Sequence, residues 1–292
     1  NKRLIGAGAT ASGALTPSEN FQIVTYTGDG TTSQAITGVG FQPDFIWVKV
    51  RSTTGSGPIA DSTRGTGKAL YSNLTDADYT FTAGEGIKSF DSDGFTVGDV
   101  SNGNAGYNGS GKTYVAWCWK ANGGTTSSNT DGAITSTVQA NTDAGFSIIK
   151  YVGNGSASQT YGHGLGVKPD MIITKELDSN TYAWTVWNKD LTSDNYFAKL
   201  NSTDAEGDGL GTAFNSGISS SVVGIGNSGQ VNKNSSNYIS YCFADIDGFS
   251  KFGSYTGNGS ANGPIVETGF EPAYLMVKRT DSADSWIILD NK

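Results

Sequence analysis

Residues 146–175 read FSIIKYVGNGSASQTYGHGLGVKPDMIITK, and the pattern of this stretch decides the fold class. It holds a tyrosine, a Gly-Asn-Gly turn, a short alternating run, a proline and, six positions after the proline, a lysine. The same pattern runs from Tyr26 to Lys49 and again from Tyr255 to Lys278. Tyrosine and proline are 17, 18 and 17 positions apart in the three copies. We interpret the chain as an array of one repeated unit.

The similarity extends well beyond this stretch. The sequence YVAWCW at 114–119 matches YISYCF at 238–243, with a cysteine at the same place. Trp184 and Asn188 correspond to Trp286 and Asp290, whereas the first copy keeps only the acid, Asp61. One unit therefore has about a hundred residues, which is a typical domain size.

The repeat predicts the following domain boundaries. An N-terminal arm or linker covers 1–20, the first sandwich 21–121, a Gly/Ser/Thr-rich linker 122–145, the second sandwich 146–244, and the truncated start of a third unit 245–292. We expect the linker to carry one short strand at 133–138. The third copy stops before its Tyr-x-x-x-Cys strand. We therefore expect it to pack on the second unit or on a neighbouring chain, or to be completed beyond Lys292.

Hydrophobic periodicity predicts an all-β fold. The run FQIVTY at 21–26, followed by Gly-Asp-Gly, is typical of a strand entering a hairpin turn. The apolar run FIWVKV at 45–50 fits a strand that is buried on both faces. The strand at 114–119 is apolar on both faces and should lie centrally in its sheet. Short strands separated by turns favour a β-sandwich, and the absence of Cys-Trp-Cys spacing favours a jelly roll over an immunoglobulin-like topology.

Composition excludes several classes of protein. Glycine accounts for 41 of 292 residues, while charged residues make up only 16%. The net charge of −8 argues against binding to nucleic acid, which needs clustered Lys and Arg. No apolar run is long enough to span a membrane. The aromatic content of 11% is enough for packed cores, so the chain as a whole is not predicted to be disordered.

The sequence offers little for catalysis, and we expect neither enzymatic activity nor a cofactor. His163 is the only histidine and is interpreted as a turn residue. Cys118 and Cys242 occupy equivalent strands of separate units, so we expect two buried, reduced thiols and no disulfide. The Gly-Asx-Gly turns lack the Lys-Ser/Thr and helix of a phosphate loop.

One acidic loop is a weak candidate for calcium binding. Asp204, Glu206 and Asp208 alternate before Gly209, as in the first half of an EF-hand loop. The twelfth position is Asn215, where an EF-hand has a bidentate Glu, so a solvated acidic turn is the favoured interpretation.

Aromatic residues after the repeat lysine are candidates for sugar binding. Aromatic rings beside Asn and Asp side chains can stack on a sugar while the polar groups bind its hydroxyls. Trp184 and Trp286 align between copies and alternate with aliphatic residues, which favours the core for both. Tyr182 and Trp187 are therefore the candidates for exposed carbohydrate-binding residues.

The chain resembles the repeated β-rich modules of tail-fibre and other virion proteins of tailed bacteriophages, particularly those of marine bacteria. The resemblance rests on FSKFGSYTGNGS at 249–260, GFEP at 269–272, VKR at 277–279 with Trp286, and the Tyr-x-x-x-Cys strands. It covers nearly everything from Phe21 onward, although the first copy lacks the tryptophan before Asp61. It implies a lectin-like sandwich in a virion appendage, with no catalytic residue to carry over.

We therefore expect a non-enzymatic virion structural protein, assembled in the host cytoplasm, that forms a tail fibre or spike touching the host surface. The expected partners are other virion proteins, further copies of the chain in a homotrimer (the state usual for fibres), and a host surface glycan. The alternatives are a capsid decoration or head-fibre protein, a polysaccharide depolymerase, and a secreted bacterial adhesin.

Overall fold

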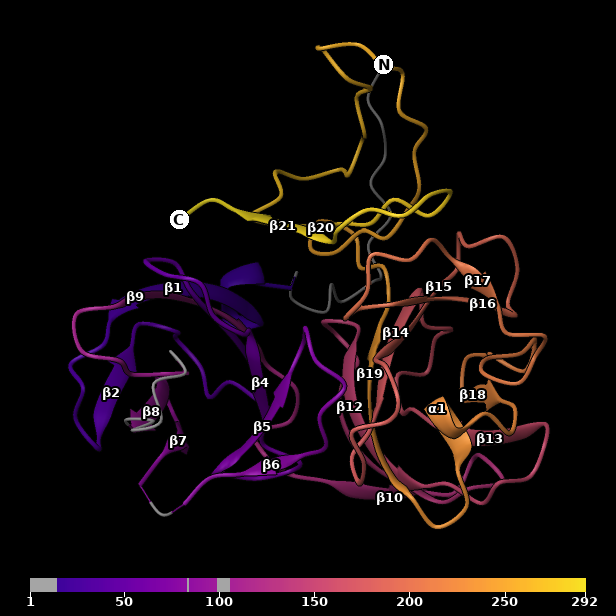
Figure 1. The fold of residues 1–292 in the computed structure, drawn as a ribbon, viewed down its shortest axis with the longest axis horizontal. Coiled ribbons are helices and arrows are strands. Elements are labelled where there is room, and N and C mark those ends of the chain that lie inside the picture. The colour runs from indigo at the N-terminus through magenta and orange to yellow at the C-terminus, as the bar shows by residue number, and fades with distance from the viewer. Residues whose placement is uncertain (1–14, 83, 99–105) are drawn as a thin grey trace, which may run out of the picture.

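The computed structural model describes residues 15–82, 84–98 and 106–292 (Figure 1). Over these residues the chain forms 21 strands, one 3-10 helix, η1 (Pro17–Glu19), and one single-turn α-helix, α1 (Gly229–Asn232). All named strand pairings are antiparallel. The predicted all-β fold is confirmed.

Residues 21–121, called unit 1 below, contain two sheets. The larger sheet has the order β1-β9-β3-β4-β5-β6 and the smaller one the order β2-β8-β7. The strands are β1 (Phe21–Thr27), β2 (Gln34–Thr37), β3 (Phe45–Val50), β4 (Pro58–Asp61), β5 (Lys68–Tyr71), β6 (Tyr79–Thr80), β7 (Gly86–Asp91), β8 (Gly94–Gly98) and β9 (Thr113–Trp119).

Residues 146–244, called unit 2, follow the same plan. The order β12-β19-β14-β15-β16-β17 lies within an eight-stranded sheet, and β13 pairs with β18 in a separate small sheet. The strands are β12 (Phe146–Val152), β13 (Gln159–Gly162), β14 (Met171–Glu176), β15 (Thr185–Asn188), β16 (Tyr196–Lys199), β17 (Gly207–Asp208), β18 (Val222–Ile225) and β19 (Asn237–Phe243).

The two cysteines occupy matching positions in the two sheets. Cys118 on β9 lies opposite Gln22 of β1 and Ile46 of β3. Cys242 on β19 lies opposite Ser147 of β12 and Ile172 of β14. The closing strand is therefore central in each unit, as its two apolar faces predict, and the matching registers support the interpretation of the chain as a repeat.

The segment expected to be a linker carries two strands, where one was expected at 133–138. β10 (Ser127–Asn129) and β11 (Ser136–Asn141) extend the sheet of unit 2 beyond β12. β11 pairs with β12 along its whole length and buries Val138. The backbone hydrogen bonds to β12 order this Ser/Thr-rich segment, although it has few apolar residues. In return, β11 covers the edge of β12 that would otherwise be exposed.

The registers of β5 and β16 show which of their residues are equivalent. β5 ends at Tyr71. There the backbone amide of Leu74 donates to the carbonyl of Tyr71 and closes a turn. β4 pairs Pro58 with Tyr71, and β15 pairs Thr185 with Lys199. Tyr71 is therefore equivalent to Lys199.

Residues 245–292, the C-terminal unit, contain one hairpin. β20 (Tyr274–Val277) pairs with β21 (Ile287–Asp290) and places Tyr274 opposite Asp290. β3 and β4 place Phe45 opposite Asp61 in the same way, so β20 is equivalent to β3 and β21 to β4. In Figure 1 this hairpin lies above both sandwiches.

The buried apolar side chains form three clusters. One lies between the two sheets of unit 1 and one between the two sheets of unit 2. The third, called the central core below, lies where the outer faces of the two large sheets meet. It includes Trp47 and Trp117 from unit 1 and Trp184 and Tyr241 from unit 2, and Tyr274 of β20 packs against it. The central core thus joins all three units.

Cys118 and Cys242 are 0% exposed, and burial raises the pKa of both thiols well above the ordinary value. We expect neither to react with a thiol reagent in the native protein and both to react after denaturation.

Cys118→Ala should cost about 1 kcal/mol of unfolding free energy, whereas Trp117→Ala should cost about 3–5 kcal/mol. Urea titration measures both, and equal losses would show that Trp117 is not part of a packed core.

Candidate functional site

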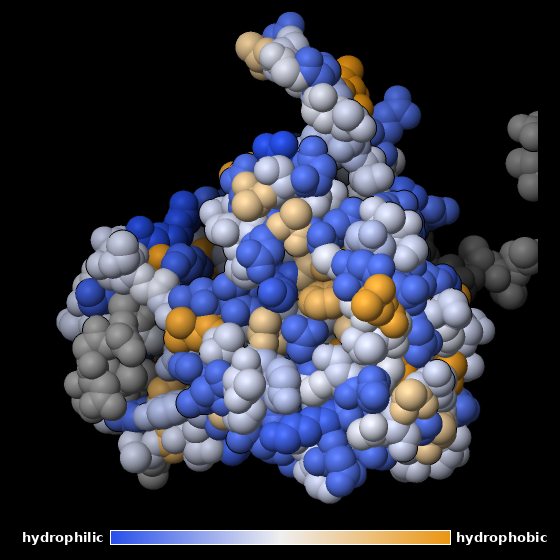
Figure 2. Space-filling view, turned by 45° about the vertical axis from the view of Figure 1, so that its right-hand side comes forward, coloured by the Kyte–Doolittle hydropathy of each residue, from blue (hydrophilic) through white to orange (hydrophobic). Residues whose placement is uncertain are grey.

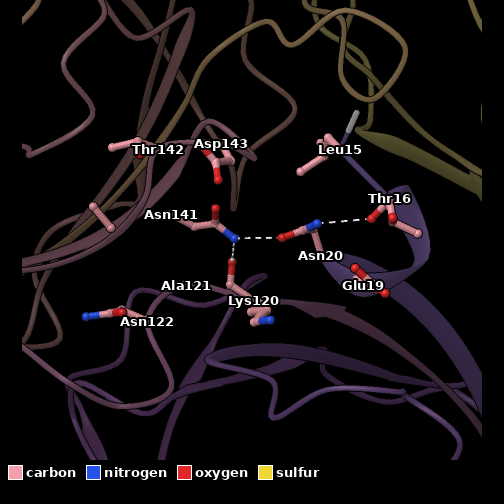
Figure 3. A pocket seen from close by; sticks show the side chains of 11 residues that line it. Leu15, Thr16, Glu19, Asn20, Lys120, Ala121, Asn122, Asn141, Thr142 and Asp143 are labelled. Atoms are coloured by element: carbon pink, nitrogen blue, oxygen red, sulfur yellow. Dashed lines mark hydrogen bonds between the residues drawn. The ribbon is translucent and has the colours of Figure 1, made fainter. Parts of the chain in front are cut away.

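A surface groove of about 430 Å³ lies where η1, the end of β9 and the β11–β12 turn meet (Figure 3). Its lining is polar: Glu19 and Asp143 supply carboxylates, Lys120 an amine, and Asn122 and Asn141 amides. Such a set can bind the hydroxyl groups of a polar ligand as donor and acceptor.

Asparagine side chains fix the shape of this groove. Asn141 donates to the side-chain oxygen of Asn20 at 2.8 Å and to the carbonyl of Lys120 at 3.2 Å. Asn20 in turn donates to the carbonyl of Thr16 at 3.0 Å (Figure 3). The wall from unit 1 and the wall from β11, which extends the sheet of unit 2, are therefore tied together. By contrast, the exposed carboxylates of Glu19 and Asp143 are not oriented by any of these bonds.

A buried group of charges lies at the contact between units 1 and 2. Asp61 of unit 1 binds Arg64 at 2.5 Å, and Arg64 also binds Asp78 at 2.6 Å. The phenol of Tyr241 from unit 2 donates to Asp61 at 2.8 Å. Burial alone lowers the pKa of Arg64, but the facing acids, Asp61 foremost, outweigh it and raise the pKa. The guanidinium thus stays charged inside the interface.

The same contact joins the C-terminal unit to unit 1. Asp290 is equivalent to Asp61, and it accepts a hydrogen bond at 3.1 Å from the indole of Trp117. Trp117 and Tyr241 occupy equivalent positions on β9 and β19. In both interfaces, the acid that ends the β4-type strand of one unit binds the central aromatic residue of the next unit.

A tryptophan contact also recurs. The indole of Trp184 in unit 2 donates to the carbonyl of Tyr71 in unit 1 at 3.0 Å. The indole of Trp286 in the C-terminal unit donates to the carbonyl of Lys199 in unit 2 at 2.9 Å. Tyr71 and Lys199 are equivalent, so the contact from unit 1 to unit 2 repeats from unit 2 to the C-terminal unit.

Backbone hydrogen bonds also join each unit to the next one. The amide of Asp78 donates to the carbonyl of Leu177 in unit 2 at 2.8 Å. The amide of Glu206 in unit 2 donates to the carbonyl of Thr280 in the C-terminal unit at 2.9 Å. Together with the acid–aromatic contacts, these bonds arrange the three units cyclically around the central core.

The lysine of the repeated pattern holds the loop that follows it. Lys49, Lys175 and Lys278 donate to the carbonyls of Gly55, Glu176 and Arg279 at 2.5, 2.6 and 2.8 Å respectively. Lys175 is 0% exposed, and burial lowers its pKa to about 8. The recurring lysine is explained by these backbone bonds.

The three carboxylates of the candidate calcium loop face different partners. Asp204 accepts from Lys199 at 3.0 Å, and this bond lowers the pKa of Asp204. Glu206 accepts from Thr192 at 2.7 Å, and Asp208 accepts from the amide of Leu210. Within the described ranges, no cluster of His, Cys, Asp or Glu suited to a metal is found. The loop contacts the C-terminal unit through Glu206 and through Lys278, which donates to Thr203.

The expectation that Trp187 is exposed is wrong. Trp187 is 0% exposed and packs in the core of unit 2, with the Lys168 ammonium 5.4 Å from the ring centroid. It lies on β15 with alternate residues facing opposite sides, and both sides of that sheet are covered by apolar layers. Its ring is therefore unavailable to a sugar.

Tyr182 lies at the surface, half-buried over α1. Its ring sits so close to Gly229 that a Cβ there would lie 2.2 Å from the phenol oxygen. The ammonium of Lys233 is 6.0 Å from the ring centroid. One ring face is thus occupied by the protein itself, and the structure does not bring Tyr182 and Trp187 together as a binding site.

Sequence reasoning overlooked the polar centre at Asp44. This carboxylate is 0% exposed and accepts from the backbone amides of Ala121, Gly123 and Gly124 at 2.7–2.9 Å. Gln139 of β11 accepts from Gly124 at 2.8 Å. Pro43-Asp44 recurs as Pro169-Asp170, and Asp170 accepts from the amide of Asp245 at 2.7 Å. In both units the aspartate binds backbone amides that follow the last strand. The repeated Pro-Asp pair in the sequence could have indicated this role.

His163 is buried, and its two ring nitrogens are used. Its Nδ1 accepts from the amide of Leu165, so Nε2 carries the proton and donates to the carbonyl of Ser219, both at 3.2 Å. Burial lowers its pKa to about 4. The neutral ring ties two turns together, as expected for a structural turn residue.

The family model that matches this chain is a domain of unknown function, DUF7483, over residues 16–292. The chain belongs to this family. No curated protein and no solved structure matches it. Among the residues that the structure describes, no helix has the length and apolar character needed to cross a membrane.

Asp61→Asn should lower the unfolding free energy by about 3–5 kcal/mol, because it leaves a buried guanidinium with part of its partner charge removed. Chemical denaturation monitored by tryptophan fluorescence measures the change. The control is Asp190→Asn, the same exchange at an exposed turn position, which should leave stability unchanged. Equal effects of the two substitutions would contradict a role for the buried pair.

His163 should make stability depend on pH between about 6.5 and 4. The unfolded chain takes up the proton near pH 6.5 and the folded chain only near 4, so folding stability is complete above 6.5 and falls as the pH drops. The loss should reach up to about 3 kcal/mol. His163→Gln should flatten the profile over this window in urea titrations. Parallel profiles for the two proteins would show that the ring titrates normally.

Proposed function

We propose that this chain is a non-enzymatic structural module of a phage virion, in a tail fibre or spike that contacts the host surface. The observation that carries the proposal is the use of its buried polar groups. Asp61, Arg64 and Asp44 are all engaged in bonds that join units or close them. A chain that places these groups at internal junctions is suited to rigid assembly.

The groove supports the part of the proposal that concerns the host surface. It offers amide, carboxylate and ammonium groups at a solvent-exposed junction of the two sandwiches (Figure 3). Sugars present closely spaced hydroxyls, which such groups bind through paired hydrogen bonds. The carboxylates of Glu19 and Asp143 are exposed, and no donor among the residues that the structure describes positions them, which favours glycan binding over glycoside hydrolysis at this place.

Mass spectrometry of purified phage particles and immunogold electron microscopy with an antibody against residues 15–292 test the location. Labelling of tail fibres or spikes is expected. Labelling of the head would favour a capsid decoration protein. Detection only in the medium of uninfected bacteria would favour a secreted adhesin and overturn the proposal. Light scattering on the purified protein tests the expected homotrimer.

A glycan array combined with a reducing-sugar assay tests the function at the surface. Binding without sugar release is expected, and Asn141→Ala should reduce binding because it removes the amide that holds the groove. Asn258→Ala, an asparagine in an exposed turn of the C-terminal unit, is the matched control. Release of reducing ends by the wild-type protein would favour a depolymerase.

A further inference from the structure

One aromatic ring of the two sandwiches is open to solvent. Figure 2 shows a surface that is mostly polar, on which apolar residues form small patches separated by polar ones. Among the described residues of units 1 and 2, Tyr79 on β6 is the exposed aromatic residue, with 43% of its surface accessible. Exposed tyrosines are common ligand contacts, because they present a flat apolar face and a polar hydroxyl.

A second tyrosine lies beside it on the same face of the sheet. The register of β5 and β6 places Ala69 opposite Tyr79, and Tyr71 follows Ala69 by two residues. The Cβ atoms of such diagonal neighbours are about 7–8 Å apart, which is within reach of aromatic side chains. The pKa of Tyr71 is raised by burial first, and then by Tyr79 and Asp76, so these three polar groups lie close together.

The ring of Tyr79 is held in place from inside the sandwich. It packs against Phe81 with the ring centroids 4.8 Å apart and the ring planes at 74°. Phe81 is buried and packs in turn on Tyr107, with the centroids 6.1 Å apart. A ring that is fixed before a ligand arrives saves the entropy of ordering it.

The polar groups around the two rings have unused hydrogen-bonding capacity. Within the ranges that the structure describes, the phenol oxygens of Tyr71 and Tyr79 and the carboxylate of Asp76 form no hydrogen bond. The nearby ammonium of Lys68 is engaged, since it donates to the hydroxyl of Thr80 at 2.6 Å and lies 3.8 Å from Asp78. The edge of unit 1 therefore offers two phenols and a carboxylate.

Unit 2 shows that the fold itself does not need these tyrosines. Lys199 is equivalent to Tyr71, and the register of β16 and β17 makes Gly207 equivalent to Tyr79. A Cβ at Gly207 would meet no atom within 4 Å, so the position is open in unit 2. Packing of the repeat thus does not explain the two tyrosines of unit 1, which favours a role at the surface.

A neutral pyranose ring matches this combination of groups. Its C–H face packs on an aromatic ring, while hydroxyls at its rim bind phenol and carboxylate oxygens. Asp76 and Asp78 make this edge negative, and the Lys68 ammonium is already engaged with Asp78. An anionic sugar is therefore repelled.

We propose that Tyr79 and Tyr71 form a binding site for a neutral hexopyranose, with the sugar stacked on the Tyr79 ring and its hydroxyls bound by the Tyr71 phenol and the Asp76 carboxylate. The site shares no residue with the groove at Asn141. It has the class of ligand in common with the proposed function, but it does not depend on the groove or on a place in a virion.

Saturation-transfer NMR titrations with the methyl glycosides of glucose, galactose and mannose, each in its α and β form, test the site. The wild-type chain should bind at least one of them. Tyr79→Ala should weaken that binding by about tenfold or more, because the stacking contact is lost. Tyr79→Phe keeps the ring and should stay within about fivefold of the wild type, the effect of one hydrogen bond.

Tyr182→Ala, which removes a surface tyrosine of unit 2, is the matched control and should bind like the wild type. Tyr71→Lys introduces the residue of unit 2 and should weaken binding without changing the midpoint of urea unfolding. Failure of all six glycosides to bind, or equal affinities of Tyr79→Ala and the wild type, would overturn the proposal. Equal losses in Tyr79→Ala and Tyr182→Ala would contradict it as well.

The charge of the site is tested with the uronate of the glycoside that binds. The uronate should bind about tenfold more weakly than its neutral parent, and Asp76→Asn should reduce this difference. Equal or tighter binding of the uronate to the wild type would contradict the assignment of Asp76.

The groove variant separates this inference from the proposed function. Asn141→Ala should leave the affinity for the hexopyranoside unchanged. Loss of binding in Asn141→Ala together with full binding by Tyr79→Ala would place the sugar in the groove, which overturns this inference and leaves the proposed function standing. Binding here without any effect of Asn141→Ala on the glycan array would do the reverse.

Discussion

The structure depends on the burial of the outer faces of the two large sheets against one another. β3, β9, β14 and β19 are apolar on both sides, so a single sandwich can cover only one of their faces. Full burial of a large apolar side chain contributes about 1.5–3 kcal/mol. Trp47, Trp117 and Tyr241 would lose this contribution in a separated unit. The units are therefore held together by the surfaces that also form their sheets.

The polar contacts between units fix the orientation in which the units pack around this apolar core. Apolar packing alone tolerates many orientations, whereas an acid that must meet one phenol or one indole does not. Asp61 and Tyr241 are 180 residues apart in sequence and are both 0% exposed. Burying such a pair brings little net stability by itself, but its partners fix how one sheet lies on the next.

The sequence predicted the fold class and the central position of the Cys-bearing strands, because both follow from alternation of apolar residues and from repeated spacing. It missed β10 and placed the strand of β11 at 133–138, three residues too early, since the order of this segment comes from pairing with β12 and not from its own composition. It placed Trp187 at the surface, because a sequence does not reveal which layer covers a strand. The sequence did not predict the ion pairs of Arg64 for a similar reason, because its acid partners come together only when the loop after β4 folds back.

The shared central core has a consequence for biosynthesis. When the first sandwich leaves the ribosome, Trp47, Trp117 and Leu70 lack the part of the central core that covers them, because it is built from residues not yet made. Nascent chains with exposed apolar sheets aggregate or recruit chaperones. The delay lasts until β12 and β14 have been translated, so the first hundred residues reach their final stability only through residues that follow them.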